Sequence, residues 1–352
     1  MGHPRIQIVR EIRTHQTAGV VRMKNQANVQ ANFRQPVSQF HTVMDEMSGD
    51  QHDAHRGSLS FWTPKPKWPR GVGCQSLFLD EVPELPEVET VRRGLAPQMV
   101  GQVFAKAIVR CGDFRYPIPL HFPQQIHGQK ITALTRRAKY LCFQTPRGHL
   151  LVHLGMSGTL RLVPATLKPE KHDHVDLVLK NGRALRFRDP RRFGALVWTE
   201  EELQHHPLLC HLGPEPLESG FDGPSFWKKS RRRKVAIKVF LMDAKMVVGV
   251  GNIYASEALW RARIHPKRAA GRISKQRMEI LVEKVKEVLA EAITQGGTTL
   301  RDFRGADGEL GYFAQKLAVY GRKGEACLKC KNKIRKTVLG QRSTFWCGQC
   351  QT

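Results

Sequence analysis

Two adjacent residues, Pro83 and Glu84, have the chemical groups needed for covalent chemistry on a sugar. A proline whose nitrogen is free is a secondary amine, which can attack a sugar carbon and form a charged imine. The reference pKa of an N-terminal amine is roughly 7.7–8.0, so part of it is unprotonated near neutrality. Opening the sugar ring needs an acid, which Glu84 could supply. Taken alone, a proline such as Pro83 is more typical of the start of a helix or turn. Glu84 and Glu87 could then complement the helix dipole, which is the role that we assign to Glu89.

The charge of the chain indicates its partner. A formal charge of +26 arises from 57 Lys and Arg against 31 Asp and Glu. Such an excess favours polyanions, because each neutralised phosphate releases counterions. We therefore expect nucleic acid, with a ribosome-associated basic protein as the alternative. No run of 18 or more apolar residues occurs, so we expect no membrane-spanning segment.

Four cysteines near the C-terminus have the spacing of a metal site. Cys327-x2-Cys330 and Cys347-x2-Cys350 are separated by 16 residues, within the range for a four-cysteine zinc ribbon. We predict one structural Zn²⁺ bound by these thiolates. Disulfides are the alternative, but the chain shows no secretory signal, and we expect a reducing cytoplasm. The intervening residues predict a hairpin, and Arg342 at its tip could enter a DNA groove.

The spacing of apolar residues predicts an α+β fold. Helical spacing begins at Glu87. From Gly101 to about Trp198, short β-rich runs are broken by turns, which indicates an N-terminal helix followed by an antiparallel β-sandwich. Beyond Leu203 the spacing of apolar residues is typical of helices, which we expect at 236–243, 253–262 and 275–293.

Four segments follow from these patterns. Residues 1–82 lack sustained periodicity and contain a Pro-rich patch, so we expect little stable structure there. The expected domains are the β-sandwich at 83–207, a helical domain at 208–317 and the zinc ribbon at 318–352.

The sequence Gly249-Val250-Gly251-Asn252 precedes the helix expected at 253–262. It lacks the third glycine and the strand–helix context of a dinucleotide-binding fingerprint. It fits the turn of a helix–two-turn–helix DNA-binding motif instead. There the glycines would let the backbone approach a phosphate, the helix N-terminus would offer N–H groups, and the amide of Asn252 would add a donor.

The chain resembles the bacterial formamidopyrimidine-DNA glycosylases over about 270 residues, from Pro83 to the C-terminus. The blocks that carry the resemblance are 83–93, 136–141, 153–158, 189–194, 249–257 and the four-cysteine tail, in the family's order. The resemblance implies a bifunctional DNA glycosylase and AP lyase of base excision repair. Such an enzyme excises oxidised purines through a proline imine, followed by β- and δ-elimination. It further implies a monomer that acts on damaged double-stranded DNA in the bacterial cytoplasm.

The resemblance also implies catalytic roles for single residues. Pro83 would be the nucleophile, Glu84 the general acid and Glu87 a supporting residue. Lys139 would contact the phosphate of the damaged nucleotide and assist β-elimination, although spacing alone favours a solvated strand residue. Arg342 would bind phosphate at the lesion and assist δ-elimination.

A further set of residues is implied to contact DNA. Matching to the family assigns such contacts to His172, Arg191, Arg233 and Asn252. An enzyme that flips a base out of the duplex must fill the space left behind, and an apolar wedge with an arginine can do this. The residues implied for that role are Met156, Arg191 and Phe193, which spacing alone would place in ordinary β-turns. A Gly-rich loop at 306–313 corresponds to the loop that closes over the everted base in the family.

The start of the functional polypeptide is a separate prediction. Val82 stands where the family has its initiator methionine. In bacteria a GTG codon encodes valine inside a gene but methionine at a start site. We therefore expect the functional chain to begin at Pro83, after removal of that methionine. Proteolysis after Val82 is a weaker alternative, because no processing signal is apparent.

Two other functions remain open from the sequence. An endonuclease VIII-type enzyme, which prefers oxidised pyrimidines, would share the fold but usually lacks the start Leu85-Pro86-Glu87-Val88-Glu89. A non-catalytic DNA-binding protein would result if residues 1–82 stayed attached and blocked Pro83.

Overall fold

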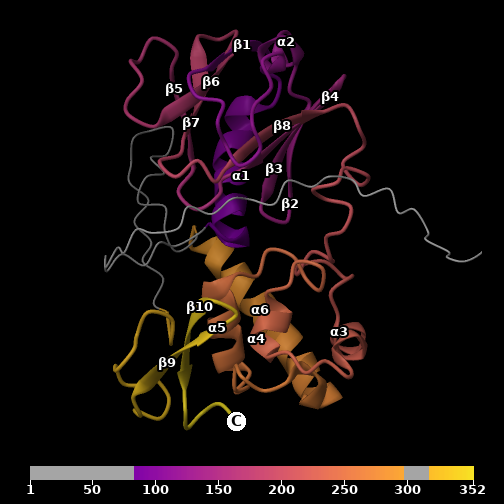
Figure 1. Cartoon of the computed structure of the whole chain (residues 1–352), viewed down its shortest axis with the longest axis vertical. Helices are drawn as coiled ribbons and strands as arrows, with labels where there is room; N and C mark the ends of the chain where they lie inside the picture. The colour runs from indigo at the N-terminus through magenta and orange to yellow at the C-terminus, as the bar shows by residue number, and fades with distance from the viewer. Residues whose placement is uncertain (1–82, 297–316) are drawn as a thin grey trace, which may run out of the picture. The chain divides into compact units, whose positions relative to one another are not determined.

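The computed structural model describes residues 83–296 and 317–352, which belong to one compact unit (Figure 1). The extension 1–82 and the loop at 306–313 lie outside the described residues. The described part mixes helices and strands, which confirms the α+β prediction. None of its helices is long and apolar enough to cross a membrane. The domain boundaries expected after 207 and 317 stay predictions.

Helix α1, Leu85–Met99, starts directly after the two residues that could act on a sugar. Pro86 lies in its first turn, where a missing N–H costs nothing. The carboxylate of Glu87 accepts the backbone N–H of Glu84 at 2.9 Å, as in a capping box. The apolar stripe that joins α1 to the sandwich core is Val88, Val91, Leu95 and Met99.

Two four-stranded antiparallel sheets form the predicted β-sandwich. The first has the order β1-β6-β7-β5, with strands Phe104–Val109, Asp173–Leu179, Arg183–Arg188 and Thr159–Pro164. The second has the order β2-β3-β4-β8, with strands Ala133–Arg137, Tyr140–Thr145, Gly148–His153 and Ala195–Thr199. A short helix, α2 (Phe122–Ile126), lies between β1 and β2 in sequence. The apolar faces of both sheets share one core with α1.

Helices follow the sandwich, as predicted. They are α3 (Gly223–Ser230), α4 (Ile237–Leu241), α5 (Asn252–Arg261), the 3₁₀ helix η1 (Ala270–Arg272) and α6 (Lys275–Thr294). The positions of α4, α5 and α6 confirm the three expected helices. Helix α3 was not predicted, because it is only eight residues long and begins with Gly and Pro. It is capped by Asp222, whose side chain accepts the backbone N–H of Ser225 at 2.8 Å.

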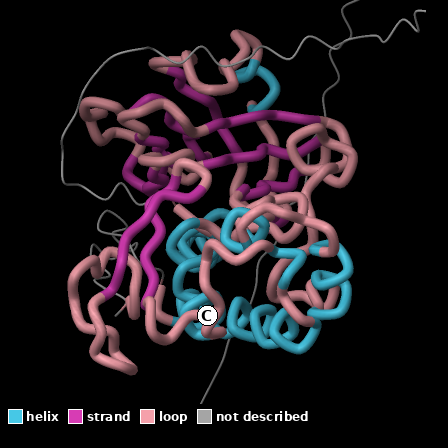
Figure 2. The backbone as a smooth tube through the Cα atoms, turned by 60° about the horizontal axis from the view of Figure 1, so that its bottom comes forward, coloured by secondary structure: helices cyan, strands magenta, loops and turns pink. Residues whose placement is uncertain are grey.

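The C-terminal module contains the predicted hairpin, with β9 at Ile334–Leu339 and β10 at Arg342–Cys347. Its two-residue turn has φ of 53° at Gly340 and 62° at Gln341, the combination that matches the twist of a hairpin. Figure 2 shows this hairpin beside the helices. Ile334 and Phe345 are buried in the same core as the helical domain, so the module is docked on the helices through apolar contacts.

Candidate active site and zinc centre

The carboxylate of Glu84 is buried against the first turn of helix α5. Its oxygens accept the backbone N–H groups of Gly251 at 2.7 Å and Ile253 at 2.8 Å, and only 2% of the residue is exposed. The N–H of Tyr254 adds a longer contact of 3.5 Å. A helix leaves its first N–H groups without intrahelical partners. Glu84 therefore completes the N-terminus of α5 from 167 residues away in the sequence.

Two glycines permit this close approach. A Cβ on Gly251 would overlap the carboxyl group of Glu84, and a Cβ on Gly249, where φ is +77°, would overlap Leu85. Sequence analysis assigned these glycines and the helix N–H groups to a phosphate. The structure corrects that assignment at Gly251 and Ile253, because the anion that they accommodate is the carboxylate of Glu84.

The environment of Glu84 favours proton exchange near neutral pH. Burial raises the pKa of its carboxyl to about 7, although the charge of Lys139 opposes this shift, while that of Glu87 adds to it. Near neutrality the group is therefore divided between its protonated and ionised forms. Such a group can donate a proton and recover it within one catalytic cycle. The geometry thus supports the general-acid role, which stays a prediction.

Glu87 orients the peptide that joins Pro83 to Glu84. It is 1% exposed, and its carboxylate accepts the N–H of Glu84 at 2.9 Å and the hydroxyl of Tyr254 at 2.6 Å. Pro83 itself is only partly buried, directly beside the candidate acid in the chain. This arrangement is consistent with the supporting role predicted for Glu87. Sequence analysis missed Tyr254, although it lies in the block 249–257.

Lys139 lies in the two-residue turn between β2 and β3, not within a strand. Its charge acts on Glu84, which places both residues in one electrostatic site. Glu215, from the segment that leads into the helical domain, holds this turn. It accepts the N–H of Ala138 at 2.6 Å and pairs with Arg136 at 2.8 Å. A turn that is fixed in this way can present a lysine to a phosphate in a defined position.

Glu89 does more than complement the dipole of α1. Burial opposes its ionisation, but hydrogen bonds from Arg92, Arg93 and Arg136 lower the pKa of its carboxyl to about 2. Arg136 forms ion pairs with two carboxylates, that of Glu89 at 3.1 Å and that of Glu215 at 2.8 Å. Glu89 is part of the network that ties α1 to the turn of Lys139.

Lys238, on α4, is a second buried charge that sequence analysis did not single out. It is 0% exposed, and its Nζ donates to Asn252 Oδ1 at 2.6 Å and to Thr344 Oγ1 at 2.9 Å. Burial lowers the pKa of its ammonium to about 7, with the charge of Glu84 opposing this shift and that of Arg342 adding to it. Lys238 therefore joins α4, α5 and β10. Its only sequence signal is a lysine among apolar residues in a short helix.

The predicted DNA contact Asn252 is the first residue of α5. Besides accepting from Lys238, its amide donates to the Tyr320 hydroxyl at 3.2 Å. The side chain is thus oriented from two sides. Its contact with DNA stays a prediction.

Arg342 and Arg233 line one cavity of about 420 Å³, beside Val239 of α4. Arg231, in the same basic run, has a structural role. Its guanidinium donates to Ile273 O at 2.7 Å and lies 4.5 Å from the ring centroid of Trp227. The structure thus brings Arg233 together with Arg342 and engages Arg231 elsewhere. The phosphate contacts of both arginines stay predictions.

The three residues predicted to fill the space of a flipped base lie on two loops that touch. A Cβ on Gly155, where φ is +68°, would come within 2.5 Å of the backbone of Phe193, so the Met156 loop rests directly on the Phe193 loop. His153 Nδ1 accepts the N–H of Gly155 at 2.9 Å and orients the first loop. On the second loop the guanidinium of Arg191 lies 5.2 Å from the ring of Phe193, which is 36% exposed. These contacts make one arginine–apolar surface, and its insertion into DNA stays a prediction.

His172 lies beside the same surface. Its carbonyl accepts the N–H of Asp189 at 3.1 Å, and Asp189 also binds the hydroxyl of Ser157 at 2.7 Å. His172 has φ of 74°, an unusual conformation for a residue other than glycine. A strained backbone that neighbouring contacts hold in place is common at functional sites. The DNA contact of His172 stays a prediction.

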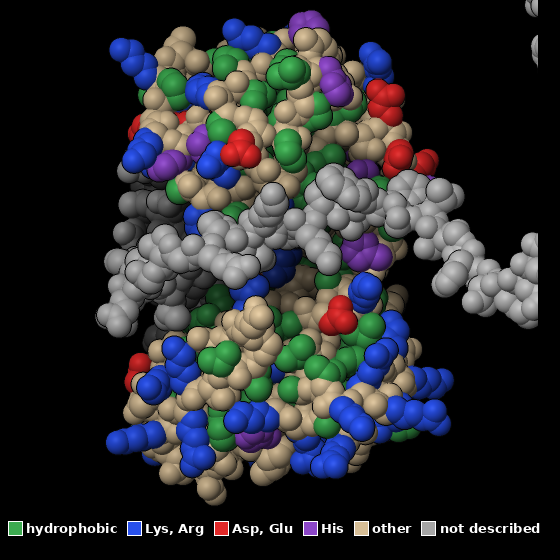
Figure 3. All heavy atoms as spheres, in the orientation of Figure 1, with side chains coloured by type: hydrophobic (Ala, Val, Ile, Leu, Met, Phe, Trp, Pro, Cys, Tyr) green, Lys and Arg blue, Asp and Glu red, His purple; other side chains and the backbone are tan. Residues whose placement is uncertain are grey.

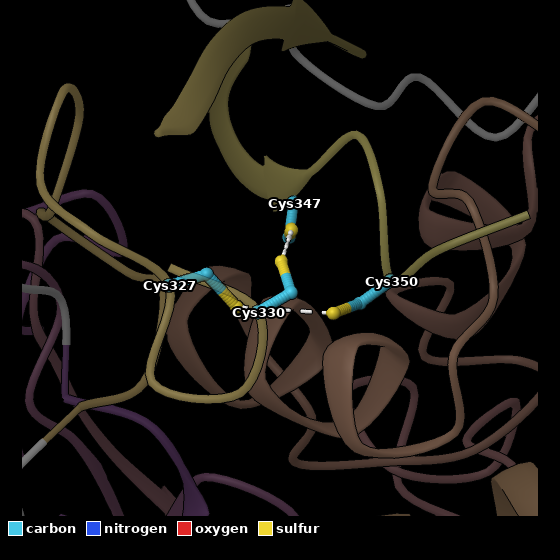
Figure 4. A group of neighbouring side chains, drawn as sticks. All are labelled: Cys327, Cys330, Cys347 and Cys350. Carbon is cyan, nitrogen blue, oxygen red and sulfur yellow. Dashed lines mark hydrogen bonds between the residues drawn. The ribbon is translucent and has the colours of Figure 1, made fainter. Parts of the chain in front are cut away.

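The four C-terminal cysteines come together as predicted. The sulfurs of Cys327, Cys330, Cys347 and Cys350 all lie within 4.8 Å of one another (Figure 4). Cys330 and Cys347 are 3.4 Å apart, and Cys327 and Cys350 are 3.9 Å apart. These separations are far longer than a disulfide bond of about 2.05 Å. Thiolates around a tetrahedral Zn²⁺, with Zn–S bonds of about 2.3 Å, would be about 3.8 Å apart. The cluster therefore fits one zinc ion.

Positive charge is prominent on the helical domain and the ribbon. Lys and Arg side chains crowd the lower half of the face in Figure 3, where α3 to α6, β9 and β10 lie. This distribution agrees with the polyanionic partner expected from the net charge of +26.

A β-sandwich joined to a helix–two-turn–helix domain and a zinc ribbon, with a buried carboxylate at the domain junction, defines a class of DNA glycosylases. Family models match nearly the whole described chain. They are the formamidopyrimidine-DNA glycosylase N-terminal domain at 82–196, the H2TH domain of the same enzymes at 212–304, and the zinc finger found in FPG and IleRS at 324–352.

Individual proteins agree with the family models. The formamidopyrimidine-DNA glycosylase of Photobacterium profundum is 54% identical over 270 residues, which are 77% of this chain and 100% of that protein. That of Escherichia coli O6:H1 is 53% identical over the same length. The chain therefore belongs to the formamidopyrimidine-DNA glycosylase family, and the resemblance, the fold and the single structural zinc predicted from the sequence are confirmed.

Solved structures match as well. The MutM (Fpg) protein of Thermus thermophilus has a TM-score of 0.68 at 39% identity, covering 76% of this chain and 98% of that one. Lactococcus lactis Fpg in complex with DNA containing an abasic site has a TM-score of 0.69 at 33% identity, covering 76% of this chain and 99% of that one.

Proposed function

We propose that this chain is a bifunctional DNA glycosylase and AP lyase that excises oxidised purines, such as 8-oxoguanine and formamidopyrimidines, in base excision repair. The observation that carries the proposal is the Glu84 carboxyl, buried at the N-terminus of α5 with a pKa near 7, directly beside Pro83. The names of its relatives and the DNA in their complexes support the same substrate class. Lactococcus lactis Fpg has been solved with DNA that contains Fapy-dG or an abasic site.

The first step forms a bond between the nitrogen of Pro83 and C1′ of the damaged nucleotide. Glu84 donates a proton to the ring oxygen, so the bond between C1′ and this oxygen breaks and the sugar opens. The amine loses its own proton, and its lone pair then expels the base from C1′. The base leaves with the electron pair of that bond and takes a proton, so the products are the free base, an opened sugar and a charged imine.

The imine makes the following eliminations possible. It withdraws electrons from the sugar, so a C2′ proton can leave and the 3′ phosphate is expelled. A second elimination expels the 5′ phosphate and leaves a one-nucleotide gap. Lys139 and Arg342 are the cations proposed to stabilise the phosphates in these steps, and Lys139 already acts electrostatically on Glu84.

This chemistry requires a free nitrogen on Pro83. The Photobacterium profundum relative is covered over its entire length by 270 residues of this chain, so 82 of the 352 residues have no counterpart in it. The family match begins at residue 82. We therefore include in the proposal that the working polypeptide begins at Pro83. We also propose that it acts as a monomer in the bacterial cytoplasm, bound to the nucleoid through DNA.

Trapping with borohydride tests the mechanism, because an imine is reducible. A chain that begins at Pro83 should form a covalent adduct with a duplex carrying 8-oxoguanine opposite cytosine. The 352-residue chain, with Pro83 in a peptide bond, should bind the duplex and form no adduct. Base release without any adduct would indicate attack by water and remove Pro83 from the mechanism. A preference for a duplex with an oxidised pyrimidine would favour the endonuclease VIII-type alternative.

Sequencing of the protein from its native source tests the start site separately. The expected N-terminus is Pro-Glu-Leu-Pro-Glu. A full-length chain that starts at Met1 and still releases 8-oxoguanine would contradict both the start site and the proline mechanism.

A further inference from the structure

A tryptophan at the end of helix α5 has a polar group that needs an acceptor. Trp260 lies in the last turn of α5 and is only 8% exposed. Its indole Nε1 is buried and has no acceptor at ordinary hydrogen-bond geometry. Buried donors in native structures are rarely left without a partner, so each exception needs an explanation.

The sulfur of Cys327 provides that explanation. The indole of Trp260 interacts with this sulfur, as do the backbone N–H groups of Cys330 and Lys329. Sulfur is a weak acceptor as a thiol, and a charged acceptor forms stronger hydrogen bonds. The indole N–H therefore gains a useful partner when Cys327 is a metal-bound thiolate.

Other contacts hold the same cysteine loop on the indole ring. Lys329 lies between Cys327 and Cys330, and its Nζ is 5.4 Å from the centroid of the Trp260 ring. Trp260, Cys327 and Cys347 belong to one buried cluster. The ring thus packs against the ribbon at the point where the metal ligands converge.

Helix α5 connects this contact to the catalytic end of the molecule. It is ten residues long, or about 15 Å at 1.5 Å per residue. Its first N–H groups hold Glu84, and its last turn holds the ribbon that presents Arg342. One rigid element therefore relates the candidate acid to the candidate phosphate-binding arginine.

We propose that Trp260 is a positioning residue of the zinc centre, whose indole N–H donates to the Cys327 thiolate and thereby retains the metal and fixes the ribbon on α5. Partners of metal ligands act in this way because they orient the ligand and tune its electron density. The proposal assigns a role to a residue that the glycosylase chemistry itself does not use.

Zinc release gives the primary test. Zinc-loaded Trp260→Phe protein should lose its metal to a coloured chelator about tenfold faster than the unsubstituted protein, the lower end of the range for loss of such a partner. Trp227→Phe is the matched control. The indole nitrogen of Trp227 is also buried without an acceptor, and its ring packs on the same core, where it contacts the guanidinium of Arg231. This control should release zinc at the original rate.

Two further measurements separate the hydrogen bond from packing. With Co²⁺ in place of zinc, Trp260→Phe should shift the sulfur-to-metal charge-transfer band, and Trp227→Phe should not. Incorporation of 3-benzothienylalanine at position 260 keeps the ring shape and replaces the N–H by sulfur, so it should reproduce the faster release. If this analogue retains zinc like tryptophan, or if Trp260→Phe changes neither the release rate nor the band, the proposed hydrogen bond is wrong.

Discussion

The buried charges at the two ends of helix α5 are compensated to different degrees. At the N-terminal end, Glu84 and Lys238 are enclosed, and burial brings the pKa values of both groups to about 7 from opposite directions. At the C-terminal end, four thiolates gather with the separations that one Zn²⁺ requires. A divalent cation compensates the thiolates, whereas the charges at the other end are only partly compensated by one another.

This difference explains why one end can react and the other is structural. A group with a pKa near the working pH can exchange protons, and it costs stability to keep such a group in a low-dielectric site. Thiolates that share a metal have no proton to exchange and instead contribute folding free energy to their module. Substitutions at the two ends should therefore fail in different ways.

The largest expected effect is at the catalytic end. Glu84→Gln removes the proton donor and keeps a carbonyl oxygen for the N–H groups of α5. We expect base release from an 8-oxoguanine duplex to fall by about 10²–10⁴-fold, the usual contribution of a general acid. Single-turnover kinetics measure this, and the zinc content should stay at one per chain. Near-normal base release by this variant would assign the acid to another group.

Substitutions at the zinc centre should act by unfolding the ribbon and not by removing a reacting group. Cys347→Ser removes a ligand from the buried side of the cluster, so the chain should lose its zinc and bind damaged DNA at least about tenfold more weakly, because metal binding supplies folding free energy to the ribbon. Metal analysis and a binding titration measure the two effects. Cys210→Ser, at an exposed cysteine outside the cluster, is the control and should change neither. A zinc-free variant with undiminished DNA affinity would separate the ribbon from DNA binding.

A further prediction concerns the close contact between Glu84, just before α1, and Gly251, just before α5. Gly251→Ala would place a methyl group on the Glu84 carboxyl, and overpacking of this kind costs about 1–3 kcal/mol. The free energy of unfolding should fall by that amount, and base release should fall with it because the carboxyl is displaced. Gly220→Ala is the control, since its Cβ would meet only Pro214 at 3.6 Å. Full activity of Gly251→Ala would mean that the contact with α5 does not position Glu84.

The two ends also differ in how much of them could be predicted from the sequence. The zinc ligands are two local pairs, so their spacing alone predicts the site. Glu84 is adjacent to Pro83, but its partners Gly251 and Ile253 are 167 and 169 residues away. Nothing local shows that a helix N-terminus will accept a carboxylate instead of a phosphate. The role of Lys238 could not be predicted for the same reason, because its burial depends on the docking of β10 against α4 and α5.

Acid–base titration of stability distinguishes the buried charges. The folded chain holds the Glu84 proton more tightly than the unfolded chain, with a pKa of about 7 against 4.5. As the pH rises from 4.5 to 7, the free energy of unfolding should therefore fall by up to about 3 kcal/mol relative to Glu84→Gln. Lys238 has the opposite sign, since its pKa falls from 10.5 to about 7. Relative to Lys238→Met, stability should rise with pH between 7 and 10.5. Denaturant titrations at a series of pH values measure both, and parallel curves for the variants and the original chain would contradict the shifts.

The smallest expected effect tests whether the zinc end shares a DNA surface with the helical domain. Arg233 and Arg342 line the same cavity, so both should neutralise phosphates of one duplex. Arg233→Ala should weaken binding a few-fold for any DNA sequence and reduce the slope of log K against log salt by about 0.9, the value for one lost phosphate contact. Arg231→Ala is the matched control, because Arg231 is engaged with Trp227 and Ile273. That substitution should lower thermal stability and leave the salt slope unchanged. If Arg231→Ala alone changed the slope, the phosphate contact would belong to Arg231, and the assignment of Arg233 would be out of register with the family.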